Sequence, residues 1–116
     1  MPDAAFFATL LDSLKDPVLF VDTNHVIRYM NKAAIARQKE GAALIGRSLL
    51  DCHQETSRRV IRDIFAAFQA GEEERMTSDT PKHRTFMRAV RDAEGRLLGY
   101  YERYEAPTAR PQSVAS

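Results

Sequence analysis

The chain has few of the features that would place it in a secreted, membrane-bound or nucleic-acid-binding class. Its 116 residues include one cysteine, Cys52, which excludes an internal disulfide and fits a reducing cytoplasm. Seventeen lysines and arginines against 16 acidic residues give a formal net charge of +1, so bulk charge does not favour nucleic acid. No apolar run approaches the roughly 18 residues of a membrane-spanning helix, and the first residues lack the basic stretch of a secretion signal. We therefore expect a cytoplasmic protein that binds neither a membrane nor nucleic acid directly.

Residue groupings that carry catalysis or bind a metal are also missing. Cys52 and His53 are adjacent, and adjacent side chains point about 100° apart on a helix or to opposite faces of a strand, so they do not suit a catalytic pair. The other histidines, His25 and His83, share no metal-ligand spacing with His53. No glycine-rich phosphate loop is present. We expect a protein that is not an enzyme and has no metal site.

The best-defined part of the sequence predicts a hairpin that leads directly into a helix. Residues 18–21 form a short apolar run behind a proline, which suits the first position of a strand. Residues 22–25 are typical of a tight turn, in which Asn24 can take a left-handed backbone. Residues 26–30 are β-branched and aromatic and predict a second strand. Asn31 can then cap a following helix by accepting from its first exposed amides.

Helices and further strands are predicted on either side of this hairpin. Apolar residues recur at helical spacing over 3–14, where Asp3 is a suitable cap, and over 55–70. The Asp-Ala-Glu-Gly sequence at 92–95 is typical of a hairpin turn. Two shorter helices and three strands are predicted at 33–39, 42–45, 75–79, 84–90 and 97–104.

The domain organisation follows from length and composition. A chain of 116 residues has room for one domain rather than two. We expect an N-terminal amphipathic helix at 1–15, an α+β domain at 16–105 and a polar tail at 106–116 that is disordered. The sequence leaves open whether the chain stands alone or is a fragment of a longer protein.

The order and spacing of these motifs resemble the PAS domain, a small sensory module of many signalling proteins. The shared features are an apolar strand ending in aspartate, a cap asparagine, an alanine pair, a Gly-Arg pair and a leucine pair, here Val18–Asp22, Asn31, Ala33 and Ala34, Gly46 and Arg47, and Leu49 and Leu50. One departure is His25, where many members carry glycine. The resemblance covers most of the chain and implies a five-stranded antiparallel sheet in the order 2-1-5-4-3 with helices on one face.

The resemblance also implies a non-catalytic module for sensing and signal transduction. Such a module would bind a small ligand, a protein partner or both, through its sheet and N-terminal helix, and would shift the balance between two packings. The residues expected to line a ligand pocket are Met30, Ile45, Leu49, Ile61, Phe65, Met87 and Arg88. The sequence leaves open the identity of the ligand, whether one exists, and the downstream output.

The strand at 84–91 allows two interpretations of that pocket, because neither of its faces is clearly apolar. If the face of Phe86 and Val90 is inside, Arg88 is buried and needs an anionic partner from the protein or from a ligand, since an unpaired buried charge is very costly. If the opposite face is inside, Arg88 is solvated. Both interpretations remain open from the sequence alone.

Two cofactors of PAS proteins can be compared with the residues present. Flavin-binding members place a reactive cysteine three residues after the glycine that Gly46 matches, and Leu49 stands there, so a flavin adduct is not supported. Haem-binding members place the iron-ligating histidine on the long helix, whereas His53 lies just ahead of it. A haem-based sensor of gas or redox state through His53 is thus the alternative function. The other role open to His53, or to Asp51, is to satisfy amides at the start of the helix.

The N-terminal helix has an apolar stripe whose partner the sequence does not reveal. It can pack on its own domain or, as in many PAS proteins, lie across the outer sheet face and contribute to a homodimer. Tyrosines on an outer face of the last strand would suit a partner surface. The interface candidates are Phe6, Phe7, Leu10, Leu11, Tyr100 and Tyr104. The expected partner is a second copy or another signalling protein.

Overall fold

The computed structural model describes residues 2–107, so most of the predicted polar tail lies outside the described residues. The helices are α1 (Ala4–Asp12), α2 (Lys32–Arg37), α3 (Glu55–Gln69) and two 3-10 helices, η1 (Gly41–Leu44) and η2 (Leu49–Cys52). The strands are β1 (Val18–Asp22), β2 (Ile27–Met30), β3 (Glu74–Asp79), β4 (Arg84–Arg91) and β5 (Leu97–Glu105). The predicted elements are present with ends shifted by no more than two residues, and η2 was not predicted.

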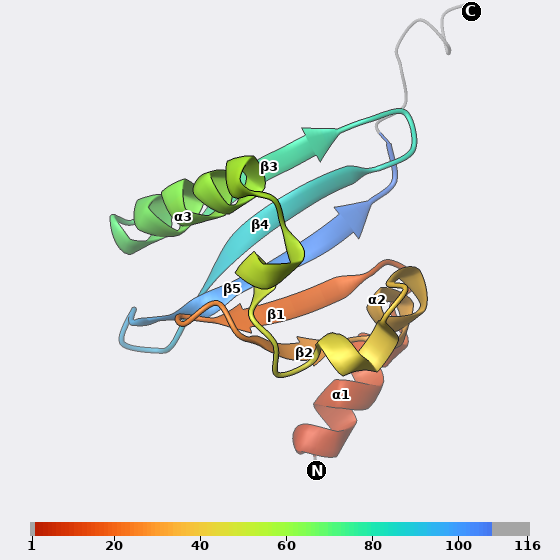
Figure 1. Ribbon diagram of the computed structural model, residues 1–116. Coiled ribbons are helices and arrows are strands. Elements are labelled where there is room, and N and C mark those ends of the chain that lie inside the picture. The colour runs from red at the N-terminus through yellow and green to blue at the C-terminus, as the bar shows by residue number, and fades with distance from the viewer. Residues whose placement is uncertain (1, 108–116) are drawn as a thin grey trace, which may run out of the picture.

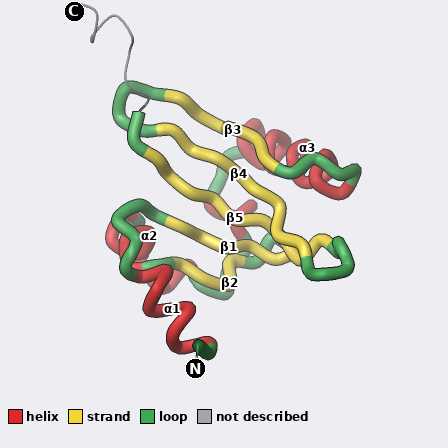
Figure 2. The backbone as a smooth tube through the Cα atoms, turned by 180° about the vertical axis from the view of Figure 1, so that it is seen from behind, coloured by secondary structure: helices red, strands yellow, loops and turns green. Residues whose placement is uncertain are grey.

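The five strands form one antiparallel sheet in the order β2-β1-β5-β4-β3, which confirms the predicted α+β architecture. Figure 1 shows α2 and α3 on one side of the sheet, which we call the inner face. Figure 2, from behind, shows the opposite or outer face, with α1 at the β2 edge. Because β5 pairs with both β1 and β4, it joins the first hairpin to the last.

Asn31 connects the first hairpin to the helices beside it. Its side-chain oxygen accepts from the backbone N–H of Val18 at 3.0 Å and of Ala34 at 2.9 Å, which confirms the predicted cap. Its amide nitrogen donates to the carbonyl oxygens of Leu11 at 3.0 Å and Asp16 at 3.1 Å. The side chain is fully buried with all these partners, so it holds three segments in one arrangement.

The turn between β1 and β2 is held by Asp22 and strained at His25. The Asp22 carboxylate accepts from the backbone N–H of Asn24 at 2.8 Å and of Val26 at 3.0 Å. The left-handed residue is His25, with φ of +64°, rather than Asn24 as expected. Its ring nitrogen Nδ1 lies 2.9 Å from the hydroxyl of Tyr100, and burial lowers the pKa of the imidazole. His25 thus adopts a backbone conformation that favours glycine, and its side chain is hydrogen-bonded to the core residue Tyr100.

The core lies between the inner face and α3. The most deeply buried side chains are Tyr100, Phe68, Ile27, Ile64, Met87, Val21 and Asn31. Tyr100 has no exposed surface, and its ring packs against Phe65 and Phe68 at centroid distances of 6.0 and 6.5 Å. The prediction that Tyr100 belongs to a dimer interface is wrong, because this strand position faces the helix.

Strand β5 passes so close to β1 at Gly99 that a side chain would not fit. A Cβ there would lie 2.1 Å from the carbonyl oxygen of Val21 and 2.9 Å from the ring of Phe20, and φ is +153°. Glycine removes this clash and so permits the central pairing of the sheet.

Helix α1 is attached to the domain mainly through its last turn. The hydroxyl of Tyr29 donates to the Asp12 carboxylate at 2.9 Å, and the backbone N–H of Lys32 donates to the same oxygen at 3.0 Å. Asp3 caps the helix as predicted, accepting from the N–H of Phe6 at 2.9 Å. No residue of α1 is buried. Within residues 2–107, none of the helices combines the length and the apolar character needed to cross a membrane.

Candidate functional site

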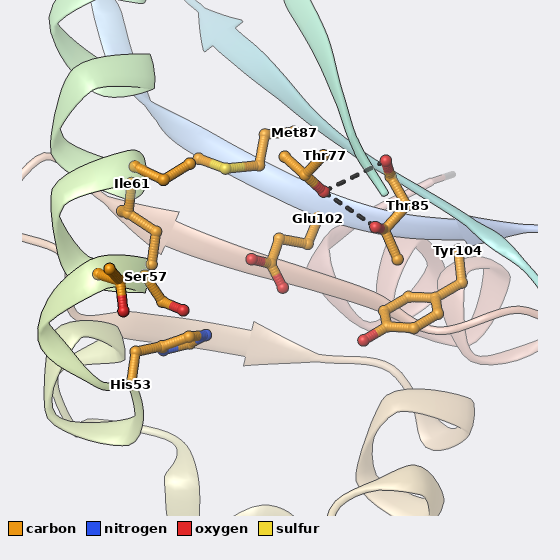
Figure 3. A pocket seen from close by; sticks show the side chains of 10 residues that line it. His53, Ser57, Ile61, Thr77, Thr85, Met87, Glu102 and Tyr104 are labelled. Atoms are coloured by element: carbon orange, nitrogen blue, oxygen red, sulfur yellow. Dashed lines mark hydrogen bonds between the residues drawn. The ribbon is translucent and has the colours of Figure 1, made fainter. Parts of the chain in front are cut away.

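A cavity of about 400 Å³ lies between the beginning of α3 and the inner face of the sheet (Figure 3). The residues on its helix side are His53, Thr56, Ser57, Val60 and Ile61. The four that belong to α3 follow helical spacing and share one face. Ile61 is buried, whereas Val60 is 52% exposed. The helix side therefore grades from apolar core to solvent.

The sheet side of the cavity follows from the alternation of β4 and β5. Its residues are Thr77, Thr85, Met87, Glu102 and Tyr104. Met87 pairs with Glu102 and Thr85 with Tyr104 across the two strands, so these four side chains project from the same face. Tyr100 lies on this face too, two residues before Glu102. The inner face is thus core at Tyr100 and becomes polar toward the end of β5.

Glu102 is the acidic group of this cavity. Figure 3 shows its carboxylate extending from β5 toward the space in front of α3. Burial raises the pKa of this carboxyl, an effect that nearby His53 partly opposes. Among the described residues, no hydrogen bond or ion pair engages its side chain. The side chain is half-buried and its oxygens reach solvent, so the carboxylate can accept hydrogen bonds from a ligand.

His53 offers a second acceptor to the cavity. Its ring nitrogen Nδ1 lies 2.8 Å from the carbonyl oxygen of Leu49, which can only accept, so Nδ1 carries the proton. In the neutral imidazole, Nε2 is then left as an acceptor. Arg58 fixes the backbone at this point by donating to the carbonyl oxygens of Leu50 and His53, both at 2.8 Å. Neither His53 nor Asp51 caps α3, which has no side-chain cap, so that sequence interpretation is wrong.

The two threonines on the sheet side bond to one another rather than to the open space. Their Oγ1 atoms, on Thr77 and Thr85, lie 2.9 Å apart, and Ser78 Oγ also bonds to Thr85 Oγ1. Figure 3 shows the threonine pair beside Glu102. The strongest groups left open to a ligand are consequently the carboxylate and the imidazole.

The structure separates the seven predicted pocket residues. Ile61 and Met87 line the cavity. Three others, Met30, Leu49 and Phe65, are buried in the core and do not line it. Ile45 is 41% exposed at the end of η1, so its prediction as a pocket residue is wrong.

Arg88 follows the second of the two sequence interpretations. It projects from the outer face, opposite to the cavity, and its guanidinium lies 3.4 Å from the Glu74 carboxylate. Its side chain is 45% exposed. Arg88 therefore needs no anionic ligand, and its prediction as a pocket residue is wrong.

Sequence reasoning missed Glu102 and assigned Tyr104 to the wrong face. The residues of β5 alternate around Tyr100, so fixing that tyrosine inside would have placed Glu102 and Tyr104 inside as well. Tyr104 instead packs between His83, at 4.9 Å between ring centroids, and the guanidinium of Arg37, at 4.4 Å from its ring. Its prediction as an outer-face interface residue is therefore wrong.

A second hollow, of about 480 Å³, lies on the outer face beside α1. Its lining is largely apolar and comes from the end of α1 and three strands: Leu11, Leu14, Val18, Phe20, Tyr29, Tyr101 and Arg103. Earlier in α1, Phe6, Phe7 and Leu10 are 48, 52 and 51% exposed. Four of the six predicted interface residues thus lie on α1, and one of them, Leu11, lines this hollow.

The residues around His53 do not fit haem. The imidazole could supply an iron ligand, because no hydrogen bond within residues 2–107 engages Nε2. The cavity, however, places the Glu102 carboxylate among the lining groups and includes no arginine or lysine to pair with the acidic groups of a haem. Because no arginine or lysine accompanies Glu102 in the lining, its charge would disfavour the carboxylates of a haem at this position.

Comparison with known proteins agrees with this architecture. A family model described as PAS fold matches residues 11–112. A C-terminal domain from Streptococcus mutans has a TM-score of 0.76 at 17% identity, covering 99% of this chain and 91% of that one. The PAS domain of BvgS from Bordetella pertussis has a TM-score of 0.70 at 19% identity over 96% and 90%. The Aer2 receptor of Vibrio cholerae, described as a dual PAS-heme oxygen sensor, has a TM-score of 0.59 at 17% identity over 80% and 95%. No curated protein sequence matches.

Proposed function

The chain belongs to the PAS fold family, and on that premise we propose that it is a non-catalytic sensory module whose signal is a small molecule bound between α3 and the sheet. Members of the family generally sense signals. A molecule in the cavity would touch α3 on one side and three strands on the other. Its binding would favour one packing of helix on sheet over another, to the extent that its affinity for the two differs.

The observation that carries this proposal is the Glu102 carboxylate, held in the cavity without a protein partner. An acid placed there for stability alone would be paired, as acids on the outer face of the same sheet are. Perturbed acids in cavities are frequent at functional sites. A bound molecule would supply the missing partner.

Native mass spectrometry of freshly purified protein tests the proposal. We expect a small molecule that stays with the wild-type chain and is lost in Ser57→Trp, which fills the cavity from α3. The matched control is Arg59→Trp, since Arg59 is exposed on the same helix and does not line the cavity. Retention of the same molecule by both variants would place its site elsewhere.

The expected output surface is α1 with the adjoining hollow on the outer face. Helix α1 carries exposed apolar side chains, and the hollow that begins at its last turn has an apolar lining that includes Leu14, itself 45% exposed. Contiguous exposed apolar surface of this kind is typical of an interaction site. We propose that its occupant is a second copy of the chain, because a two-fold dimer apposes the same patch from both subunits.

Sedimentation analysis tests this dimer. Phe7→Glu is expected to weaken the association of two chains at least about tenfold, since it puts a charge into the apolar contact. Leu98→Glu is the matched control, because Leu98 is a comparably exposed apolar residue, at 47%, outside the proposed surface. Equal effects of the two variants, or a wild-type chain that stays monomeric at high concentration, would contradict the proposed dimer.

A further inference from the structure

We propose that the cavity selects small molecules that carry a protonated amine or amidine, whose N–H groups donate to the Glu102 carboxylate and to Nε2 of His53. This inference rests on the proposed ligand-binding function and names the chemical class of its ligand. It follows from the hydrogen-bonding balance, the charge and the shape of the lining.

The carboxylate and the imidazole of the cavity are acceptors, while the hydroxyls of Thr56, Ser57 and Tyr104 can donate or accept. Ionised Glu102 can only accept, and His53 accepts at Nε2 because its Nδ1 proton is already donated to the Leu49 carbonyl at 2.8 Å. The hydroxyls of Thr77 and Thr85 bond to each other at 2.9 Å. A ligand that bonds to both Glu102 and His53 must therefore bring hydrogen-bond donors.

The charge of the lining favours a cation over an anion. It has one acid, Glu102, and neither arginine nor lysine. Arg58, which follows Ser57 in the sequence, is committed to two backbone carbonyls at 2.8 Å. The positive end of the α3 dipole, which would attract an anion, already has Glu55 in the first helical turn. A carboxylate or phosphate ligand would face the Glu102 charge with the His53 imidazole as the one basic side chain of the lining.

The apolar part of the lining limits the rest of the ligand. Ile61 from α3 and Met87 from β4 lie together on one side of Glu102 (Figure 3), and they are 5% and 1% exposed. A compact apolar body would contact these two side chains while its charged group reaches the carboxylate. A primary amine on a small ring or short chain meets both requirements, whereas a polyphosphate or a di-acid meets neither.

Three size-matched probes test the inference by NMR titration of the ¹⁵N-labelled full chain. They are benzylamine, benzyl alcohol and benzoate, which differ in charge but little in shape. We expect benzylamine to shift the amide signals of Ser57, Met87 and Glu102 saturably, and to bind at least about tenfold more tightly than benzyl alcohol, because its hydrogen bond to the acid is charge-assisted at both ends. Benzoate is expected to leave these signals unchanged.

Two variants assign the preference to the carboxylate. In Glu102→Gln the preference for benzylamine over benzyl alcohol should disappear, with the fold retained in the spectrum. Glu94→Gln removes the same charge from the exposed turn between β4 and β5, where the side chain is 72% exposed, and should bind like wild type.

The outcomes separate this inference from the proposed function. Tighter binding of benzoate than of benzylamine, or an unchanged preference in Glu102→Gln, would overturn the amine inference and leave a ligand-binding cavity of another class. If none of the three probes shifts the cavity signals and native mass spectrometry finds no retained molecule, both the inference and the proposed function fail.

Discussion

Adjacent charged residues of β5 have different surroundings on the two faces of the strand. On the outer face, Arg103 lies 2.7 Å from the carboxylate of Glu74 and 2.7 Å from that of Glu105, and it covers the ring of Phe86 at 4.4 Å. On the inner face, the preceding residue Glu102 has no such partner among the described residues. The outer charges form a network that fastens β3, β4 and β5 together, whereas the inner charge lies at the cavity.

The difference extends to the acid–base properties of the two carboxyls. The hydrogen bond from Arg103 holds the pKa of Glu74 below its ordinary value, while burial raises the pKa of Glu102. By linkage, ionised Glu74 adds to stability near neutral pH and ionised Glu102 subtracts from it. One acid therefore supports the fold, and the other weakens it where the cavity lies.

The largest expected effect separates core from surface on β5. Tyr100→Ala should lower the free energy of unfolding by about 3–5 kcal/mol, because it removes a fully buried ring. Tyr101→Ala, on the partly exposed outer face, should cost only about 1 kcal/mol. Urea denaturation measures both. Equal costs would mean that the assignment of the two faces is wrong.

The next effect tests the outer network. Arg103→Ala should destabilise the protein by about 2 kcal/mol, since it leaves Glu74 and Glu105 without their shared cation. Arg96→Ala is the control, because its side chain is 78% exposed and its ion pairs are local to the turn. It should cost less than about 0.5 kcal/mol. If denaturation curves show that Arg103→Ala loses no more stability than this control, the ion-pair network does not stabilise the fold.

A smaller effect of opposite sign is expected at Glu102. Glu102→Gln should raise the free energy of unfolding at pH 7 by about 1 kcal/mol in the absence of ligand, because it removes a partnerless charge. Since the folded-state pKa is raised, the folded protein binds the extra proton between the ordinary and the raised value, and wild-type stability falls as pH rises through that window. The gain should therefore vanish below the ordinary carboxyl pKa. A destabilised Glu102→Gln at pH 7 would point to a protein partner for the acid.

The smallest effect concerns Arg88, on the outer face opposite the cavity. Arg88→Ala should change stability by less than about 0.5 kcal/mol, because its ion pair with Glu74 is long and exposed. Its affinity for benzylamine should equal that of wild type. Altered probe binding in Arg88→Ala would restore the interpretation in which this arginine belongs to the pocket.

The individual elements could be predicted because their signals are local: the cap at Asn31, the glycine-containing turn at 92–95 and the apolar stripe of α3 each specify a short segment. The observed strand order was expected from the resemblance to the PAS family. The face of β5 could not be predicted in this way. Its sequence, Leu-Leu-Gly-Tyr-Tyr-Glu-Arg-Tyr-Glu, carries aromatic and charged residues on both faces, so alternation alone leaves two choices.

The candidate site was missed for a related reason. Whether a charge is paired depends on residues distant in sequence: Glu74 and Arg103 are 29 positions apart. Nothing in the neighbourhood of Glu102 distinguishes it from Glu105, which is paired with two arginines. Only the three-dimensional register shows that one acid has cations beside it and the other faces a cavity.

The most direct test of this contrast is a ¹³C NMR titration of the side-chain carboxyls of Glu74 and Glu102 in the same ligand-free sample. The account predicts that Glu74 titrates below the ordinary glutamate pKa, because of Arg103, and that Glu102 titrates above it. A Glu102 carboxyl that titrates at or below the ordinary value would show that the acid is paired or fully solvated, and would contradict the cavity acid on which the proposed function depends.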